Sequence, residues 1–203
     1  MQENLNGSHE DAREEIRRLI EEVAQTPLIQ TRDIPKVDLY MEQVVSFFDQ
    51  EMRAFARDPQ DKVFTHTMIN NYAKAGILPR PDKKRYGRRH LITLIYIFLL
   101  KQVLSIQDIG DFFAIMQDKD HEQLEAFYNI YQELADEYRA EYTRVNCERE
   151  ERIAQRLKEH GLEGARYEKM MLLSLLSLEA TAHKMVCTRL LDASKDPDES
   201  PKK

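Results

Sequence analysis

Residues 68–100 of the chain read MINNYAKAGILPRPDKKRYGRRHLITLIYIFLL, and four kinds of local structure follow one another in this stretch. Thr65 is placed to cap a short helix over 66–74, and Gly76 fits the left-handed residue that ends such a helix. Residues 77–87 contain two prolines and no helical period, which predicts a loop or a small two-stranded wing. Residues 90–102 predict a strongly apolar helix.

Positive charge is concentrated around the same stretch. Residues 62–101 hold nine Lys or Arg and one acid, Asp82, a net charge of +8. The rest of the chain therefore carries −14, because the whole chain carries −6. A charge distribution this polarised is expected of a protein that binds phosphate groups. A solvated basic surface has the same composition, so the local pattern of residues must decide between the two.

The composition of the 203-residue chain limits its class. A hydrophobic content of 42% with 33% charged residues is typical of a soluble globular protein, and only six glycines argue against a β-rich one. Cys147 and Cys187 lie far apart without a CxxC partner, so we expect reduced thiols in a cytoplasmic protein. The N-terminal segment does not resemble a signal peptide. The most apolar run, residues 170–178, is shorter than the roughly 20 residues of a membrane span, so we expect a buried helix and no membrane.

Helical periodicity accounts for most of the remaining sequence. Apolar stripes predict helices over 8–24 and 38–57, and Ser105 with Asp108 forms a capping box for a helix towards Met116. A seam at steps of three and four, typical of a coiled coil or bundle, comprises Leu124, Phe127, Tyr131, Leu134, Tyr138, Tyr142 and Val145. Residues 166–191 predict a helix that is apolar on most of its circumference, which its own chain or a partner must cover.

These elements predict an all-α fold with four parts. Residues 1–33 form an N-terminal helix and linker, and residues 34–117 form a central domain. Residues 118–191 form a helical bundle or coiled-coil-like region for dimerisation or ligand binding. The polar, proline-containing residues 192–203 form a disordered tail.

The helix predicted over 66–74 has two chemically different faces. Met68, Ile69 and Tyr72 fall on the side that would be buried, and the opposite side carries His66, Thr67, Asn70, Asn71 and Lys74. Asn pairs bidentately with adenine and Thr contacts the thymine methyl, so this face suits the major groove of DNA. We expect phosphate contacts from Arg80, Lys83, Lys84, Arg85, Arg88 and Arg89. Arg88 and Arg89 oppose the dipole at the start of the next helix, a cost that a bound anion would relieve.

Residues 68–113 resemble the winged helix-turn-helix of the MerR family, over about a quarter of the chain. Tyr72, Gly76, Ile77 and Leu78 match its "YY-x-x-x-G-L-L" signature, and Lys84 and Tyr86 match the basic and aromatic residues of its wing. The third helix is matched by Leu94, Ile97 and Leu100, and the "G-[FL]-S-L-x-E-I" element by Leu104, Ser105, Ile106 and Ile109. The resemblance implies a DNA-binding domain and adds Tyr86 to its contact residues.

The whole chain is still more similar to a bacterial family, the domain-of-unknown-function 1836 family. Its pattern "IP-x-[IV]-DLYM-[DE]-QV" appears at residues 34–44, and its "TMINNY" and "LP-x-P-x-KK-x-Y" elements appear within residues 61–86. This similarity implies a MerR-like fold with an extra helical region and no established activity. Two features depart from MerR proteins: Asn70-Asn71 replaces the usual Arg-Tyr, and a longer helix over 38–57 replaces the short first helix.

The sequence therefore predicts a transcriptional regulator that binds double-stranded DNA, as a homodimer because paired half-sites supply affinity and register. Two alternatives remain: a protein-interaction module whose basic face meets an acidic partner, and a sensor whose small-molecule effector enters the C-terminal bundle. Because no glycine-rich phosphate loop, G-x-S-x-G elbow or His-Glu-x-x-His spacing occurs, we expect no catalytic residue, no metal ligand and no cofactor.

Overall fold

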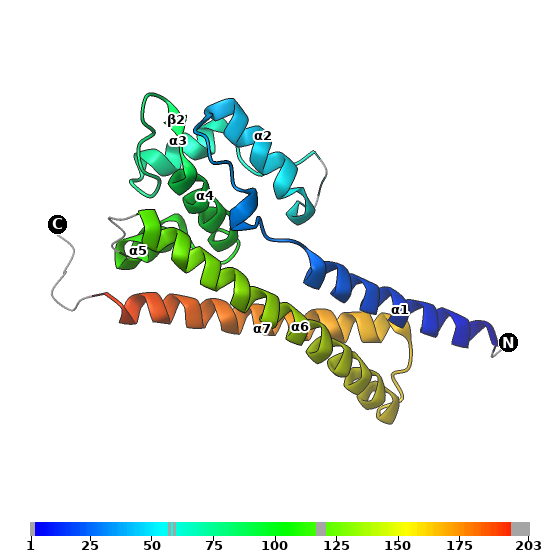
Figure 1. The fold of residues 1–203 in the computed structure, drawn as a ribbon. Helices are drawn as coiled ribbons and strands as arrows, with labels where there is room; N and C mark the ends of the chain where they lie inside the picture. The colour runs from blue at the N-terminus through cyan, green and yellow to red at the C-terminus, as the bar shows by residue number, and fades with distance from the viewer. Residues whose placement is uncertain (1–2, 57, 59, 117–120, 196–203) are drawn as a thin grey trace. The chain divides into compact units, whose positions relative to one another are not determined.

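The computed structural model describes residues 3–56, 58, 60–116 and 121–195, and these residues are mainly helical, as predicted. Seven α-helices and two short strands occur among them (Figure 1). The chain folds into two compact units. Unit 1 combines the chain up to Thr26 with Glu133–His183, and unit 2 combines Pro27–Gln132 with the chain from Lys184 onwards. The grouping is not linear, since α6 (His121–Glu159) and α7 (Ala165–Ala193) each contribute to both units.

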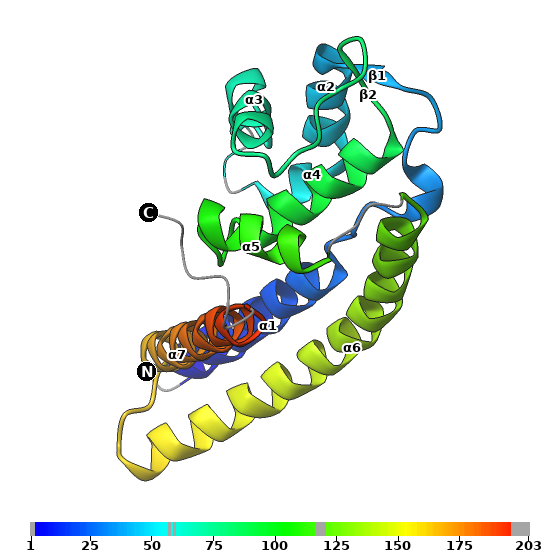
Figure 2. The same cartoon turned by 90° about the vertical axis from the view of Figure 1, so that its left-hand side faces the viewer.

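Unit 2 is built around α4 (Arg88–Leu100), whose residues 91–98 are all buried. The other elements of this unit are β1 (Leu39–Tyr40), α2 (Met41–Glu51), α3 (His66–Lys74), β2 (Arg85–Tyr86) and α5 (Ile106–Met116), with 3₁₀ turns at Thr31–Asp33 and Arg53–Phe55. Both views place α3 and the loop before β2 on the side of α4 away from α5 (Figures 1 and 2). One side of α3 therefore packs against the core of the unit, and its opposite side faces solvent.

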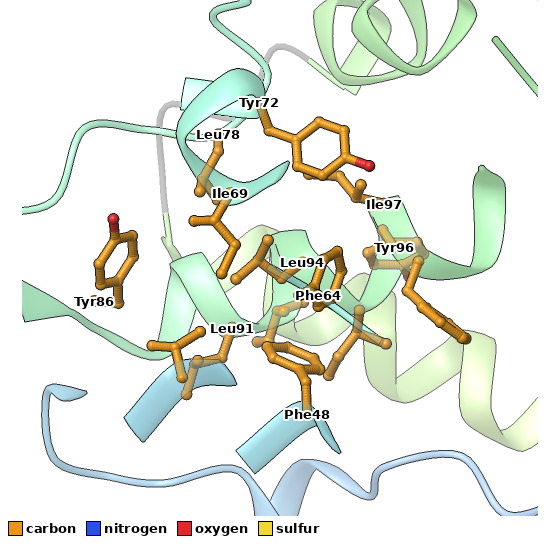
Figure 3. Packing of buried hydrophobic residues seen from close by; sticks show 14 of the residues in the cluster. Phe48, Phe64, Ile69, Tyr72, Leu78, Tyr86, Leu91, Leu94, Tyr96 and Ile97 are labelled. Carbon is orange, nitrogen blue, oxygen red and sulfur yellow. The ribbon is translucent and has the colours of Figure 1, made fainter. Parts of the chain in front are cut away.

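The packing behind α3 consists of large apolar side chains from α2, α3, α4 and the segment before α3. Phe48 of α2 and Phe64 meet edge to face with ring centroids 5.0 Å apart, and both are fully buried. Leu91, Leu94 and Ile97 of α4 are also fully buried, and Figure 3 shows Ile69 and Tyr72 of α3 facing the same cluster. Side chains of this size remove most of their apolar area from water, which is the main favourable contribution to folding.

Two predicted helices have different bounds in the structure. The helix expected over 38–57 is shorter, because residues 39–40 form strand β1 and α2 ends at Glu51 before a 3₁₀ turn. The helix expected over 8–24 is longer and spans Glu3–Gln25 as α1. The capping box predicted at the start of α5 is correct: the Ser105 amide donates to Asp108 Oδ2 at 3.0 Å, and the Asp108 amide donates to Ser105 Oγ at 3.1 Å.

Unit 1 packs α1 against parts of α6 and α7. Its small apolar core comprises Ile16, Ile20, Ile153, Leu157 and Leu172. Two carboxylates are buried beside this core, and both are paired: Arg13 donates to Glu168 at 3.0 Å, and Arg17 donates to Glu150 at 3.1 Å. A buried charge needs such partners to offset its desolvation. The ion pairs therefore hold α1 in place where the apolar core is narrow.

The prediction of a buried helix over 170–178 is wrong. Within this run Leu172 is buried, whereas Leu173 and Leu178 are 66% and 65% exposed, and Met170 and Met171 are also exposed. Among the described helices, α7 alone is long and apolar enough to cross a membrane, as judged by length and composition. The coiled-coil seam of α6 is likewise divided: Leu124 is buried in unit 2, whereas Phe127, Leu134 and Tyr138 are exposed. The predicted tail begins at residue 192, but α7 continues to Ala193, and residues 196–203 lie outside the described part.

Candidate nucleic-acid interface

The helix α3 is fixed by local contacts at both of its ends. The Thr65 hydroxyl accepts a hydrogen bond from the Met68 amide at 3.2 Å, which caps the first turn. At the other end Gly76 adopts φ = +76°, and the amides of Ile77 and Leu78 both donate to the Tyr72 carbonyl. A left-handed residue here favours glycine, since it has no Cβ to oppose that conformation. Both ends match the sequence prediction.

The two faces of α3 also separate as their spacing predicts. Ile69 and Tyr72 are buried, and Met68 is partly buried against the same core. The outer side of the helix is formed by five exposed residues, namely His66, Thr67, Asn70, Asn71 and Lys74. Burial raises the pKa of the Tyr72 hydroxyl, which is consistent with its role as an anchor. The side-chain amides of Asn70 and Asn71 are thus presented to solvent on a helix whose opposite side is held firmly.

A tight turn over Asp82–Arg85 displays two adjacent lysines. The Arg85 amide donates to the Asp82 carbonyl at 2.8 Å, and the residues between them, Lys83 and Lys84, have φ values of 47° and 65°. Two consecutive left-handed residues define a type I′ turn, for which Asn and Gly are strongly preferred. A lysine in this conformation costs about 1 kcal/mol or more. The turn therefore places two positive charges at its tip in a conformation that its sequence does not favour.

Residues 77–87 form a loop that ends in a minimal antiparallel pairing, a single bridge between Asp82 and Arg85 across the turn, as one of the two predicted alternatives expects. Strand β2 pairs antiparallel with β1, with Leu39 opposite Tyr86 and Tyr40 opposite Arg85, so its partner strand precedes α2. Residues 77–84 form the loop and the turn. At Gly87 an added Cβ would lie 2.9 Å from Asp38 Oδ1, so a larger residue at the start of α4 would displace the Asp38 side chain.

Tyr86 was predicted to contact DNA, but its side chain is only 4% exposed. It packs edge to face on the His90 ring at 5.5 Å, within the cluster that also contains Leu78 and Leu91 (Figure 3). Burial raises the pKa of its hydroxyl. Tyr86 therefore fixes the end of the turn from inside rather than presenting a surface for a ligand.

Arg88 was predicted to hold phosphate, but the structure engages its guanidinium inside the protein. It donates to the two carboxylate oxygens of Glu125 at 2.7 and 2.9 Å and to the carbonyls of Ile34 and Thr31 at 2.8 and 2.6 Å. The hydrogen bond to Glu125 raises the pKa of Arg88 and lowers that of Glu125. The anion expected beside this cation at the start of a helix is thus Glu125 of the same chain. The prediction for Arg88 is corrected accordingly.

Two other cations of the basic stretch are held by the protein. Lys62 donates to Asp49 at 2.7 Å. Lys101 donates to the Val63 carbonyl at 3.2 Å and lies over the rings of Phe64 and Phe98, 5.0 and 4.7 Å from their centroids. Burial lowers the pKa of Lys101. Neither of these lysines contributes an unengaged charge to a ligand surface.

Arg89 is partly buried at the edge of a hollow of about 260 Å³. The hollow lies among the turn after α3, α4 and α5, and its wall includes Ile77, Thr93 and Phe113. The neighbouring His90 accepts a hydrogen bond from the Gly87 amide at 3.1 Å through Nδ1, which caps α4. Arg89 thus lies beside the helix dipole of α4 but is less accessible than the loop cations.

A smaller basic surface remains after these corrections. It consists of five exposed side chains, Lys74, Arg80, Lys83, Lys84 and Arg85, and we call it the basic rim. None of the five forms an ion pair within the described part of the chain. The rim joins the end of α3 to the loop and turn that follow it in sequence. Asn70 and Asn71 therefore lie on a polar helix face that leads into a cationic loop.

The sequence interpretation lacked two features of this site. The left-handed lysines had no signal, because Lys-Lys is not a sequence typical of a type I′ turn. The capture of Arg88 by Glu125 involves residues 37 positions apart, a separation at which local spacing carries no information. Among the described residues, no group of three or more His, Cys, Asp or Glu side chains lies close enough together to hold a metal ion.

Comparison with known proteins gives one match. The family described as "Domain of unknown function (DUF1836)" matches residues 29–134, which include the whole candidate interface and more than half of the chain. Comparison with curated proteins and with solved structures gives no match. The matched range nearly coincides with the continuous part of unit 2, Pro27–Gln132. On this match, the chain belongs to the DUF1836 family.

Proposed function

We propose that this chain is a transcriptional regulator that binds double-stranded DNA. The outer face of α3 enters the major groove, and the basic rim holds the flanking phosphates, as in a MerR-like winged helix-turn-helix. The protein acts in the cytoplasm as a homodimer and has no catalytic role. Asn70 and Asn71 contact base edges, since the Asn amide matches the donor and acceptor pair of adenine.

One observation carries the proposal. The turn that follows α3 holds Lys83 and Lys84 side by side with positive φ, at a cost of about 1 kcal/mol or more for each. A structural role gives no reason for lysine at these positions, because Asn and Gly would form the same turn without that cost. A ligand with closely spaced negative charges supplies the reason, since strain in the backbone is often retained at binding sites.

The exposed amides on α3 favour DNA as the polyanion. A polar helix beside cations is the arrangement that reads base edges while phosphate contacts fix its position. The helix-turn-helix part of the likeness is weaker, because residues 52–65 separate α2 from α3 whereas the motif has a turn of about three or four residues. The turn over Asp82–Arg85 and the outer face of α3 support the proposal more strongly than the connection between α2 and α3 does.

The test is selection of bound fragments from a random duplex pool by the purified full chain. We expect enrichment of an inverted repeat, because two copies of one module read two half-sites. A pool with no enriched sequence at low salt would contradict the proposal. Competition by unlabelled duplex DNA also separates the proposal from the alternative of an acidic protein partner. Duplex DNA should displace a bound DNA fragment, whereas a module that binds only an acidic protein would retain no DNA fragment to displace.

Two variants separate base contacts from phosphate contacts on the selected site. Asn70→Ala should weaken binding to that site by about 1–3 kcal/mol and leave random duplex unchanged. Lys83→Ala should weaken binding to both duplexes and reduce the salt slope by about 0.9. Lys158→Ala, an exposed cation of α6 in unit 1, is the control for net charge and should change neither. Equal losses for Asn70→Ala on both duplexes would show that Asn70 reads no base.

A further inference from the structure

The outer face of α7 carries a regular seam of alternating large and small side chains. Its members recur at steps of three and four residues, and they are Met171, Ser174, Leu178, Thr181, Met185 and Thr188. The three large residues are 42%, 65% and 49% exposed in this order. Leu172, the buried apolar residue of α7 in unit 1, lies on the opposite side of the helix. We call these six residues the α7 seam, and its spacing is that of a helix that packs along a second helix.

The small residues of the seam are prepared for removal from water. The Ser174 hydroxyl donates to the Met170 carbonyl at 2.8 Å, the Thr181 hydroxyl to the Ser177 carbonyl at 2.8 Å, and the Thr188 hydroxyl to the Met185 carbonyl at 3.0 Å. A hydroxyl that already donates to its own helix leaves no unpaired donor when it is covered. Burial of this seam by a partner therefore costs little in lost hydrogen bonds to water.

We propose that the α7 seam packs against the α7 seam of a second copy of this chain, with the two helices antiparallel. In this register Leu178 lies opposite Thr181 of the second copy, Ser174 opposite Met185, and Met171 opposite Thr188. Every layer then combines one large apolar side chain with one small one, so all layers have similar volume and the helices approach closely. A parallel pair would instead alternate Met or Leu layers with thin layers of two hydroxyl residues.

The charges beside the seam favour the same direction. In the antiparallel register the flanking residues place Lys184 opposite the neutral Ser177 of the second copy. In the parallel register Lys184 lies opposite Arg189 of the second copy, and two-fold symmetry repeats this like-charge contact. Charges at such flanking positions commonly set the orientation of paired helices. The sequence of α7 thus penalises the parallel pair.

A second copy fits this surface better than a lipid bilayer does. α7 has the length and composition of a membrane span, but Glu179 lies near its middle and pairs with Arg149 of α6 at 2.9 Å. A charge at this depth in hydrocarbon costs several kcal/mol, as would the nearby Lys184. In a helix pair Glu179 lies outside the seam and keeps its ion pair. The inference specifies the homodimer of the proposed function, but it needs no DNA, so the two can fail separately.

The first test is the mass of the full chain in solution, measured by analytical ultracentrifugation over a range of concentrations without DNA. We expect the unaltered chain to be a dimer. Leu178→Glu places two carboxylates near the two-fold axis and should raise the dimer dissociation constant on the order of 100-fold. Leu173→Glu is the matched control, because Leu173 is equally exposed but lies off the seam, and it should leave the dimer intact.

The remaining outcomes overturn the proposal. A monomeric unaltered chain, or equal effects of the two substitutions, would show that the α7 seam is not the interface. Sedimentation of the chain with neutral phosphatidylcholine vesicles, abolished by either substitution, would identify a lipid surface as the occupant. Circular dichroism of each variant should retain the helical signal of the unaltered chain, which excludes loss of the fold as the cause.

The second test determines the direction of the pair. In a background with Cys147→Ser and Cys187→Ser, one chain carries Leu178→Cys and another carries Thr181→Cys. An antiparallel pair should form a disulfide mainly between the two different chains, because these positions face each other across the pair. Disulfides formed mainly within each single-variant sample would indicate a parallel pair and contradict the proposed register.

Discussion

Two helices of this protein, α4 and α7, each contain a strongly apolar run, residues 91–98 and 170–178, but the two runs differ in what covers them. Residues 91–98 of α4 are buried on every side by α2, α3, α5 and α6. In the run 170–178 of α7, Leu172 is buried while Leu173 and Leu178 are largely exposed. A helix that is apolar around its circumference must be covered by other groups. The difference between α4 and α7 shows that the sequence of the helix does not tell whether its own chain provides this cover.

The largest expected effect comes from deleting the same side chain in each helix. Leu94→Ala in α4 should lower the free energy of unfolding by about 2–5 kcal/mol, because it leaves a cavity in a fully packed core. Leu178→Ala in α7 should change it by about 0.5 kcal/mol or less at protein concentrations where the chain is monomeric. Urea unfolding followed by circular dichroism measures both. A similar loss for both variants would show that α7 is covered within a single chain.

A second contrast concerns the arginine at the start of each helix. Arg88→Ala removes four hydrogen bonds, two of them to Glu125, and should cost about 2–3 kcal/mol. Arg166→Ala near the start of α7 removes an exposed cation that opposes the helix dipole, and it should be neutral or slightly stabilising. Urea midpoints of the two variants provide the measurement. Equal destabilisation would mean that the Arg88 contacts contribute nothing beyond an exposed charge.

The contrast between these arginines shows what could be predicted from the sequence. The caps at Thr65 and Gly76 and the two faces of α3 were predicted, because each depends on residues within one turn of helix. The role of Arg88 was not, because its partners Thr31 and Glu125 lie far from it in the sequence. The exposure of α7 was not predicted for the same reason: periodicity describes a helix, but not its neighbours.

The acid limb of the stability curve tests the Arg88 contact without a change of sequence. The hydrogen bond from Arg88 to the Glu125 carboxylate holds the pKa of Glu125 in the folded protein below the 4.5 of a free glutamate. The pair therefore stabilises the fold above pH 4.5, and this contribution is lost as the pH falls through the lowered pKa of Glu125. Glu125→Gln should remove that part of the pH dependence below pH 4.5, as measured by thermal unfolding. An unchanged slope would show that the pair makes no net contribution.

The smallest expected change in stability lies in the turn that leads into α4, and its sign is opposite. Lys83→Asn combined with Lys84→Gly gives the turn the residues that its φ values favour. The fold should gain about 1 kcal/mol, less than the full strain of both lysines, because Asn keeps part of the left-handed cost and Gly adds entropy to the unfolded chain. The same variant should bind DNA more weakly, with a salt slope reduced by about 1.8 if both lysines contact phosphate. Lys83→Gln with Lys84→Gln is the matched control: it removes the charges but keeps the strained turn, so it should lose binding without gaining stability. Stability and DNA affinity should move in opposite directions only if the lysines are kept for a ligand. A stabilised variant with unchanged DNA binding would therefore show that the turn has no role in binding.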